Sequence, residues 1–495
     1  MKKTTKNIII ALAVLLVLGI AMAVLLLTEP KPETEPETSA PSAGFELMDP
    51  IIDNTPADYK KIELTKSENG EVWTMIPIKG TENSEENDAF TFEGWEDQPV
   101  MNSNVTDIAY DFYYFRPTKE IENVDDLAAF GLSGDGLFKV VATLNDGSTD
   151  TFLVGHEAGE TYGRYVLYED HVYILPISLY ITRAKTDFIS TSVLTIPNMT
   201  DYVTENGIAI ETLMSSIRFS GTNYPEEVLI QYSDDAVLYY EMSEPIFTGA
   251  NTTRIDEIIA QLQDLKADAV AAVNVTDEEL KVYGLDEPST VIDFELNFEK
   301  HQLRLGSLVK GMYSLMIDDN KTVYMVSEDT VSTWCNPSLF DLRDGFIRLP
   351  NIKGVKKLTV TSAEGTETYD AKRIKNEEKS TEKVPFYDLE ITRNGKEVDY
   401  DTMYQPFYQS ILSVYVMNEE LREPQGEPVF TVRYEYYDDQ NLEPEEVSFY
   451  KDPQNDRQYI ATFNGQASAI VRASNVEKVL TKKALIAANE IVEKD

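Results

Sequence analysis

The sequence predicts an α+β protein in which an N-terminal transmembrane helix is followed by three related units, each an antiparallel sheet with a helix against one face. Three observations predict this architecture: one long apolar segment near the N-terminus, a Pro- and Glu-rich segment after it, and a threefold recurrence of one order of strand and helix patterns. The chain has 495 residues, of which 42% are hydrophobic, so it can form several cores.

Composition excludes two classes of protein. The chain has 43 Lys and Arg against 86 Asp and Glu, a formal net charge of -43, which would repel a phosphate backbone. We therefore expect no nucleic-acid partner. Cys335 is the only cysteine, so no intrachain disulfide can form, and the chain is not a disulfide-stapled secreted protein.

The apolar segment at residues 8–27 is twenty residues long, which is enough to cross a hydrocarbon core of ~30 Å as a helix. Three lysines precede it, and acidic residues follow. By the positive-inside rule, residues 1–7 stay in the cytoplasm and everything after the segment is extracytoplasmic. The sequence thus predicts a single-pass protein of the cell membrane that contacts the lipid bilayer through Ile8 to Leu27.

A cleaved signal peptide is the alternative, because Ala21-Met22-Ala23 has the small-x-small form of a cleavage site. Cleavage there would leave an apolar stub from Val24 onward, so we expect the anchor to be retained. Residues 28–50 lack a regular apolar pattern and begin with a Pro- and Glu-rich stretch, which predicts an extended linker.

The three predicted units cover residues 51–190, 191–350 and 351–495, the third being divergent. Each is expected to open with a pair of alternating strands around a turn. The apolar positions of these strands are Ile62, Leu64, Val72 and Met75 in the first unit, Val228, Ile230, Val237 and Tyr239 in the second, and Leu389 and Ile391 before Asn394-Gly395 in the third.

A helix with a 3.6-residue apolar period is predicted next in each unit. The second unit shows it most clearly, with a capping box at Thr253 and Asp256 before the periodic positions. Those positions are Ile255, Ile258, Ile259, Leu262 and Leu265, with Val105, Ile108, Phe112 and Phe115 in the first unit and Tyr404, Phe407, Ile411 and Val414 in the third.

A short acidic helix follows, in two similar copies: TDEELKVYGLDEPS from Thr276 and NVDDLAAFGLSGDG from Asn123. In the first of these, Thr276 and Glu279 form a capping box, Gly284 can adopt the left-handed conformation that ends a helix, and Leu285 can pack back on the last turn. A helix-capping role explains every repeated residue, so no ligand is required.

The equivalent positions in the first unit are Asn123, Asp126, Phe130, Gly131 and Leu132. The third unit keeps only Leu421 of this pattern. Each unit is then predicted to end in two hairpins, the first of which ends a strand at Gly155 or Gly306.

These residues resemble the repeat of the domain of unknown function 4340 family. The resemblance covers most of residues 60 to 335 and fades in the third unit. Its structural motif residues are Tyr283, Gly284, Leu285 and Gly306, with Phe130, Gly131, Leu132 and Gly155. It implies a bacterial, membrane-anchored, extracytoplasmic protein associated with ABC transporter and gliding-motility-type auxiliary systems, and it implies no reaction.

No catalytic, metal-binding or cofactor-binding residue is predicted. His156 begins a sequence similar to the H-E-x-x-H zinc motif but lacks the second histidine. Ser380 and Lys383 match S-x-x-K without its companion motifs. The acidic stretches at 318–320 and 399–401 do not continue into a calcium loop. The aromatic residues 110–115 could form a platform for glycans, although core packing is the simpler interpretation.

The function expected from these observations is that of a non-enzymatic accessory or scaffold component, with the subunits of an ABC-type transporter as partners. The alternative is a protein that binds cell-envelope polysaccharide or peptide, and an envelope hydrolase ranks below both. Repeated positions are helix caps and core residues, whereas catalysis needs polar groups that converge in a pocket.

Overall fold

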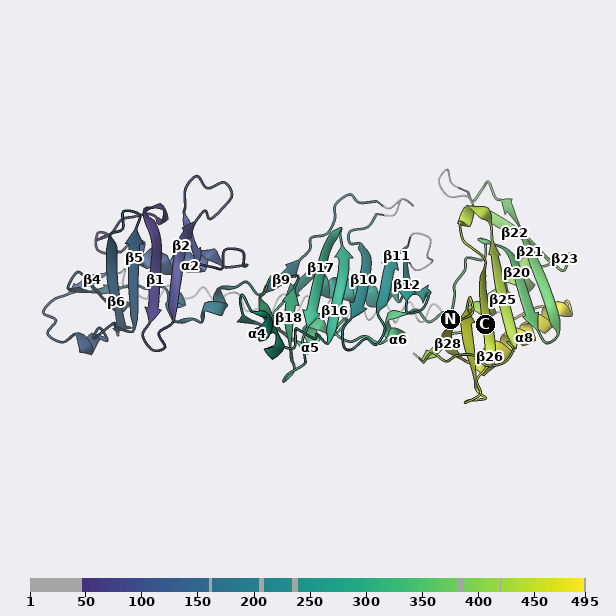
Figure 1. The fold of residues 1–495 in the computed structure, drawn as a ribbon. Helices are drawn as coiled ribbons and strands as arrows, with labels where there is room; N and C mark the ends of the chain where they lie inside the picture. The colour runs from purple at the N-terminus through teal and green to yellow at the C-terminus, as the bar shows by residue number, and fades with distance from the viewer. Residues whose placement is uncertain are drawn as a thin grey trace, which may run out of the picture. The chain divides into compact units, whose positions relative to one another are not determined.

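The computed structural model describes residues 47–159, 163–203, 209–233, 239–380, 386–418 and 420–493. The predicted anchor at residues 8–27 and nearly all of the predicted linker lie outside these residues. Within the described part, every helix is too short or too polar to cross a membrane. The described chain is a mixed α/β structure with seven α-helices and three large antiparallel sheets (Figure 1).

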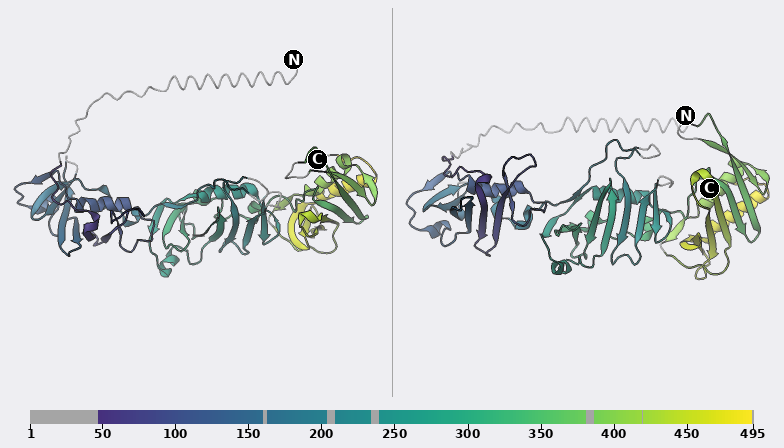
Figure 2. Two further views of the ribbon diagram at one scale, coloured as in Figure 1. Left: turned by 90° about the horizontal axis from the view of Figure 1, so that it is seen from above. Right: turned by 45° about the horizontal axis from the view of Figure 1, so that its top comes forward.

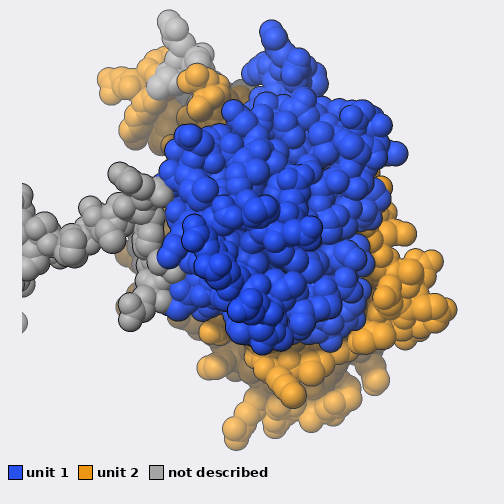
Figure 3. Space-filling model, turned by 90° about the vertical axis from the view of Figure 1, so that its left-hand side faces the viewer, with its two compact units in different colours: residues 1–88, 107–181 blue, residues 89–106, 182–495 orange. Residues whose placement is uncertain are grey.

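The chain divides into two compact units, unit 1 with residues 1–88 and 107–181 and unit 2 with residues 89–106 and 182–495 (Figure 3, blue and orange). The first sheet has the strand order β3-β2-β1-β5-β6-β7-β8-β4. Its elements are β1 (Tyr59–Lys66), β2 (Val72–Ile78), β3 (Ala89–Phe92), α2 (Asn102–Tyr113), β4 (Lys119–Ile121), the 3-10 helix η2 (Leu127–Phe130), β5 (Phe138–Leu144), β6 (Thr149–Glu157), β7 (Arg164–Tyr168) and β8 (His171–Leu175).

The second sheet has the order β13-β12-β11-β10-β16-β17-β18-β19-β15, and Figure 2 (right) shows its strands side by side. Its elements are β10 (Met214–Ser220), β11 (Val228–Tyr232), β12 (Tyr240–Glu244), β13 (Thr248–Gly249), α3 (Thr252–Gln263), β15 (Ala269–Ala272), α4 (Asp277–Val282), β16 (Thr290–Leu296), β17 (Glu299–Leu305), β18 (Met312–Ile317), β19 (Val323–Ser327), α5 (Glu328–Val331) and α6 (Leu339–Leu342). Strands β9 (Ser192–Thr195) and β14 (Asp264–Lys266) form a separate pair.

The third sheet has the order β23-β22-β21-β20-β25-β26-β27-β28-β24. Its elements are β20 (Val355–Ser362), β21 (Gly365–Lys375), β22 (Tyr387–Arg393), β23 (Lys396–Val398), the π-helix η5 (Tyr400–Tyr404), α7 (Gln405–Leu412), β24 (Val416–Asn418), β25 (Phe430–Tyr436), β26 (Glu445–Lys451), β27 (Gln458–Phe463), β28 (Gln466–Arg472) and α8 (Ala473–Ala487).

The strand order follows one scheme in all three sheets. In the second and third sheets, the first four strands in the chain run outward from the middle, the last four run the other way, and the fifth closes the far edge. The first sheet has the same scheme with one strand fewer. In each sheet a helix, α2, α3 or α7, precedes the short strand at that edge, and in the second sheet β14 stands between α3 and that strand.

Most of the apolar positions of the alternating strands and of the periodic helices are buried in the cores, as the sequence predicts. In unit 1, Ile62 and Leu64 of β1 are fully buried, and Phe112 of α2 packs on Phe152 of β6 with ring centroids 5.3 Å apart. In the second sheet, Ile217 and Phe219 share one core with the apolar face of α3, and the third sheet has a core of its own with α7 and α8.

Two predicted openings are corrected by the structure. The second sheet starts with β10, one strand before the predicted pair, and the third starts with β20 and β21 before the predicted hairpin at 389–395. Those strands alternate between apolar and polar side chains as well, for example Ile217 and Phe219 around Arg218 in β10. The sequence interpretation did not use this alternation, so it began one or two strands late.

The capping box predicted at Thr253 and Asp256 is wrong. The N-cap of α3 is Asn251, whose side-chain oxygen accepts a hydrogen bond from the Arg254 amide at 3.3 Å. The helix also ends earlier than predicted, because Leu265 lies in β14. Leu265 is still buried in the same core, so its apolar character came from packing and not from the helical period.

Candidate functional site

The repeated short helix ends in the same hydrogen-bond pattern in both copies. In α4, Thr276 and Glu279 form the predicted capping box. At the other end, the Gly284 amide donates to the Lys281 carbonyl at 3.2 Å and the Leu285 amide donates to Leu280 at 3.0 Å. Gly284 has a φ of 66°, in the left-handed region that favours glycine. This is a Schellman C-cap, as the sequence predicts.

The copy in unit 1 repeats this geometry at η2. The Gly131 amide donates to Ala128 at 3.1 Å, and the Leu132 amide donates to Leu127 at 3.0 Å. Gly131 is left-handed, with a φ of 72°. The N-cap is Asp126, whose side chain accepts from Ala128, so Asn123 is not the counterpart of Thr276.

A second contact explains the glycine predicted to end a strand in each copy, although Gly155 lies inside β6 and only Gly306 directly follows its strand. A Cβ atom on Gly306 would lie 2.1 Å from the Tyr283 carbonyl oxygen, and one on Gly155 would lie 2.1 Å from the Phe130 carbonyl oxygen. No side chain fits at either distance. The aromatic residue and the glycine of the motif are therefore the two sides of one close backbone contact.

The third sheet has a different contact at the corresponding place. The residue after β26 is Asp452, which is buried and pairs with the Arg422 guanidinium. A charged pair between the same two segments thus stands where the other sheets have a glycine against a carbonyl. The described residues 420–429 form no helix, so this part of the third unit needs no Gly-Leu pair to end one.

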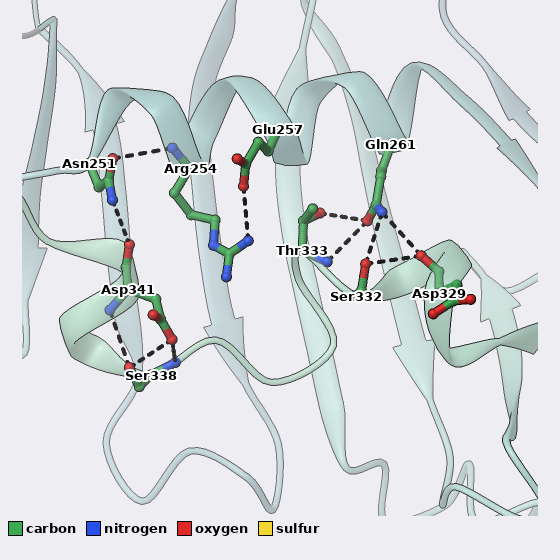
Figure 4. Close-up of polar contacts among 9 residues, drawn as sticks. All are labelled: Asn251, Arg254, Glu257, Gln261, Asp329, Ser332, Thr333, Ser338 and Asp341. Carbon is green, nitrogen blue, oxygen red and sulfur yellow. Dashed lines mark hydrogen bonds and ion pairs between the residues drawn. The ribbon is translucent and has the colours of Figure 1, made fainter.

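Polar side chains also fix α3 to the segment that follows the second sheet (Figure 4). Asn251 donates to the Asp341 carbonyl at 3.1 Å while its oxygen caps the helix at Arg254. Near the other end, the Gln261 side-chain oxygen accepts from the Thr333 hydroxyl at 2.5 Å. Each of these side chains has its hydrogen-bond partners within the protein, as is typical of a structural network.

Two arginines of the connection after α6 join the second and third sheets of unit 2. Arg348 donates to Glu445 of β26 at 2.9 Å and to Glu241 of β12 at 3.1 Å. Its guanidinium also lies 5.1 Å from the Phe247 ring, which stacks on Phe463 of β27. Burial opposes the charge of Arg348, but the two carboxylates prevail and raise its pKa.

Arg343 makes the second part of this joint. It is 3% exposed, and it donates to the Ser468 carbonyl at 2.7 Å and to the Thr248 hydroxyl at 3.2 Å. Burial lowers its pKa to about 10 and raises the pKa of its neighbour Asp344 to about 6. The Asp344 carboxylate lies so close to Gly249 that a Cβ there would be 2.1 Å away. We call residues 343–348 and their contacts the joint.

Unit 1 contains a cavity of about 670 Å³ beside α2. Asp111 lines it, is 9% exposed and accepts a hydrogen bond from the Ser178 amide at 2.7 Å. Burial, with a smaller contribution from the Asp107 carboxylate, raises the Asp111 pKa to about 8. A carboxyl with so perturbed a pKa in a cavity marks a candidate binding site.

The described residues of the zinc-like, S-x-x-K and acidic motifs make contacts of a structural kind. His156 packs over Gly131, where a Cβ would lie 2.8 Å from the imidazole ring. Asp399 caps η5 by accepting from the Thr402 amide at 2.8 Å, and Asp318 accepts from the Gln302 amide at 2.8 Å. Ser380 donates to a backbone carbonyl, while Lys383 lies outside the described residues.

Metal binding has no candidate in the described part of the chain. No group of three or more His, Cys, Asp or Glu side chains there is placed to hold an ion. In the aromatic tract, Phe112 and Phe115 are fully buried in the core, whereas Tyr110 is 46% exposed and lines the cavity beside Asp111.

The sequence interpretation missed Asp111 and the two joint arginines. A weak signal existed for Asp111, since an acidic residue among the aromatics of a core helix needs an explanation. The arginines stand in a connection without regular periodicity, so nothing in the sequence distinguished them from exposed charges.

Comparison with known proteins supports the resemblance for part of the chain. The family model of the domain of unknown function DUF4340 matches residues 241–414. This segment carries the DUF4340 resemblance. It contains Tyr283, Gly284, Leu285, Gly306 and residues 343–348 of the joint. The matched segment reaches α7 of the third sheet, further than expected, and it does not include the copy in unit 1. No curated protein and no solved structure matched.

Proposed function

We propose that this chain is a non-enzymatic accessory or scaffold component of a membrane-bound extracytoplasmic assembly, of the ABC transporter type. The joint carries the scaffold part of this proposal. Its two arginines, Arg343 and Arg348, belong to the DUF4340 segment; Arg343 is buried, and each of the two side chains contacts residues of the second and of the third sheet. The membrane location rests on the apolar segment at residues 8–27, and the partner class rests on the family resemblance.

We also propose that the three sheets are copies of one unit. The shared strand order supports this, together with the identical C-cap geometry of the Gly131 and Gly284 turns. A protein built from copies of one sheet carries a similar surface more than once. Such a surface suits the organisation of other subunits better than it suits a single reaction.

Affinity purification tests this function. The full-length tagged protein would be crosslinked in cells, solubilised from membranes and analysed by quantitative mass spectrometry. Stoichiometric recovery of transporter subunits is the expected result. Recovery of the protein alone, from crosslinked as well as untreated membranes, would contradict the proposal.

Binding of a cell-envelope polymer is the second candidate function. The observation that favours it is the cavity beside Asp111, which has the volume of a ligand site. Saturable binding of the purified protein to isolated cell-wall polysaccharide, in the absence of any transporter subunit, would support this alternative.

A further inference from the structure

The lining of the cavity beside Asp111 combines apolar and polar groups. It lies against α2, the facing ends of β6 and β7, and residues 176–179. Its large apolar groups are the Tyr110 ring, Pro176, Ile177 and Leu179. Leu179 is 82% exposed and Tyr110 is 46% exposed, so these large groups are kept at the mouth of the cavity and not in the core.

The Tyr110 ring is held in place by its neighbours on the helix. It meets the Tyr113 ring edge-on, with centroids 5.4 Å apart and an interplanar angle of 87°, and it lies 5.2 Å from the Tyr114 ring. A fixed aromatic ring beside aliphatic side chains provides a flat apolar surface at low entropic cost. Ligands with a flat C–H face can stack on such a surface.

The polar groups include Asp111, which is uncharged at neutral pH because burial raises its pKa to about 8. One carboxyl oxygen accepts from the Ser178 amide at 2.7 Å. A protonated carboxyl has one O–H to donate and further acceptor capacity. Asp111 can therefore donate to one hydroxyl of a ligand and accept from another.

The charges around the cavity exclude an anionic ligand. Arg164, the cation among the lining residues, already donates to the Gly155 carbonyl at 3.1 Å and to Glu157 at 3.2 Å. Asp107 adds a carboxylate to the lining. An anion would thus approach two carboxylates and a guanidinium that is already paired.

We infer that this cavity binds an uncharged carbohydrate, which stacks on Tyr110 and Leu179 and exchanges hydrogen bonds with the carboxyl group of Asp111. This inference rests on the second candidate function and gives its site and its ligand class. An ammonium ligand is the competing class, because it would pair with an ionised Asp111. The two classes have opposite pH dependence.

Calorimetric titration of the purified full-length protein with maltose, cellobiose and N,N′-diacetylchitobiose tests the inference. We expect saturable binding of at least one of them at pH 7. The affinity should fall ~10-fold by pH 9, because most of the Asp111 carboxyl loses its proton above a pKa of about 8. Spermidine and lysine methyl ester serve as ammonium probes.

Variants separate the site from the fold. Asp111→Asn keeps a donor and an acceptor, so binding should persist and lose its pH dependence, whereas Asp111→Leu should weaken it ~10-fold or more. Leu179→Ala should weaken binding in a protein whose core is unchanged. The matched control is Asp170→Asn, an exposed turn residue, which should leave both affinity and its pH dependence unchanged.

Two results would overturn the inference: absence of saturable binding to all three saccharides, or binding of an ammonium probe that strengthens from pH 7 to pH 9. Neither result bears on recovery of transporter subunits, so failure of this inference is distinguishable from failure of the scaffold proposal.

Discussion

Replacement of Asp111 by Asn should stabilise unit 1 at neutral pH. Burial raises the Asp111 pKa from its ordinary value of 3.8 to about 8, so the native protein holds a proton that the unfolded chain releases. Stability therefore falls as pH rises between these two values, by ~1.4 kcal/mol per pH unit. At pH 7 the accumulated cost is on the order of 4 kcal/mol.

Asparagine removes this cost because it does not titrate, and its carbonyl oxygen can still accept from the Ser178 amide. The gain should be close to zero at pH 4 and should reach its full size near pH 8. A ~4 kcal/mol gain at pH 7 corresponds to a ~1,000-fold slower exchange of amides that open only by unfolding of unit 1.

Hydrogen–deuterium exchange with mass spectrometry can measure this effect in the full-length protein. Peptides that cover β5 and β6 report on unit 1, and comparison of variant and wild type at the same pH cancels the intrinsic exchange rates. Asp170→Asn is the control. The reasoning is refuted if Asp111→Asn has the same effect at pH 5 and pH 8, or if it destabilises unit 1 at every pH.

Three further predictions concern the motif, the joint and the anchor. Gly306→Ala should lower the free energy of unfolding by about 2–4 kcal/mol, because the new Cβ would collide with the Tyr283 carbonyl. The control Gly345→Ala should change the melting temperature little, because the nearest atom to its Cβ would be 3.8 Å away. Arg348→Met should lower the free energy of unfolding, measured in urea, by ~3–5 kcal/mol, because Glu241 and Glu445 lose their cationic partner. The control Lys372→Met breaks an exposed ion pair and should lower it by less than ~1 kcal/mol. Protease added to spheroplasts should digest the ectodomain and spare an N-terminal tag if residues 8–27 span the membrane, and a soluble mature chain that lacks them would contradict this.

The sequence predicted local structure well where one residue type strongly favours one local conformation or contact. Gly284 and Gly131 are left-handed helix ends, and Thr276 caps α4, because glycine conformation and capping depend on a few neighbouring residues. Strands with alternating apolar and polar residues, such as β1, were also predicted, because that alternation is visible in a few neighbouring residues. These features need no knowledge of distant contacts.

Long-range features were less predictable. The close contact between Gly306 and the Tyr283 carbonyl depends on how the end of β17 meets the end of α4, 23 residues earlier, and the sequence showed both residues but not their contact. The joint depends on Arg348 meeting Glu241 and Glu445, which are far apart in the chain. The pKa of Asp111 is raised chiefly by burial, and burial of one side chain cannot be read from a single sequence.

We propose that Arg343 and Arg348 of the DUF4340 segment hold the second and third sheets in one fixed arrangement. A distance distribution between spin labels tests it most directly. Labels at Lys300 in the second sheet and Lys372 in the third would be placed by cysteine substitution, with Cys335, the only native cysteine, replaced by alanine. We predict one narrow distribution that broadens when Arg348→Met is added. A broad distribution in the protein with its joint intact, or a narrow one that the variant leaves unchanged, would contradict the account.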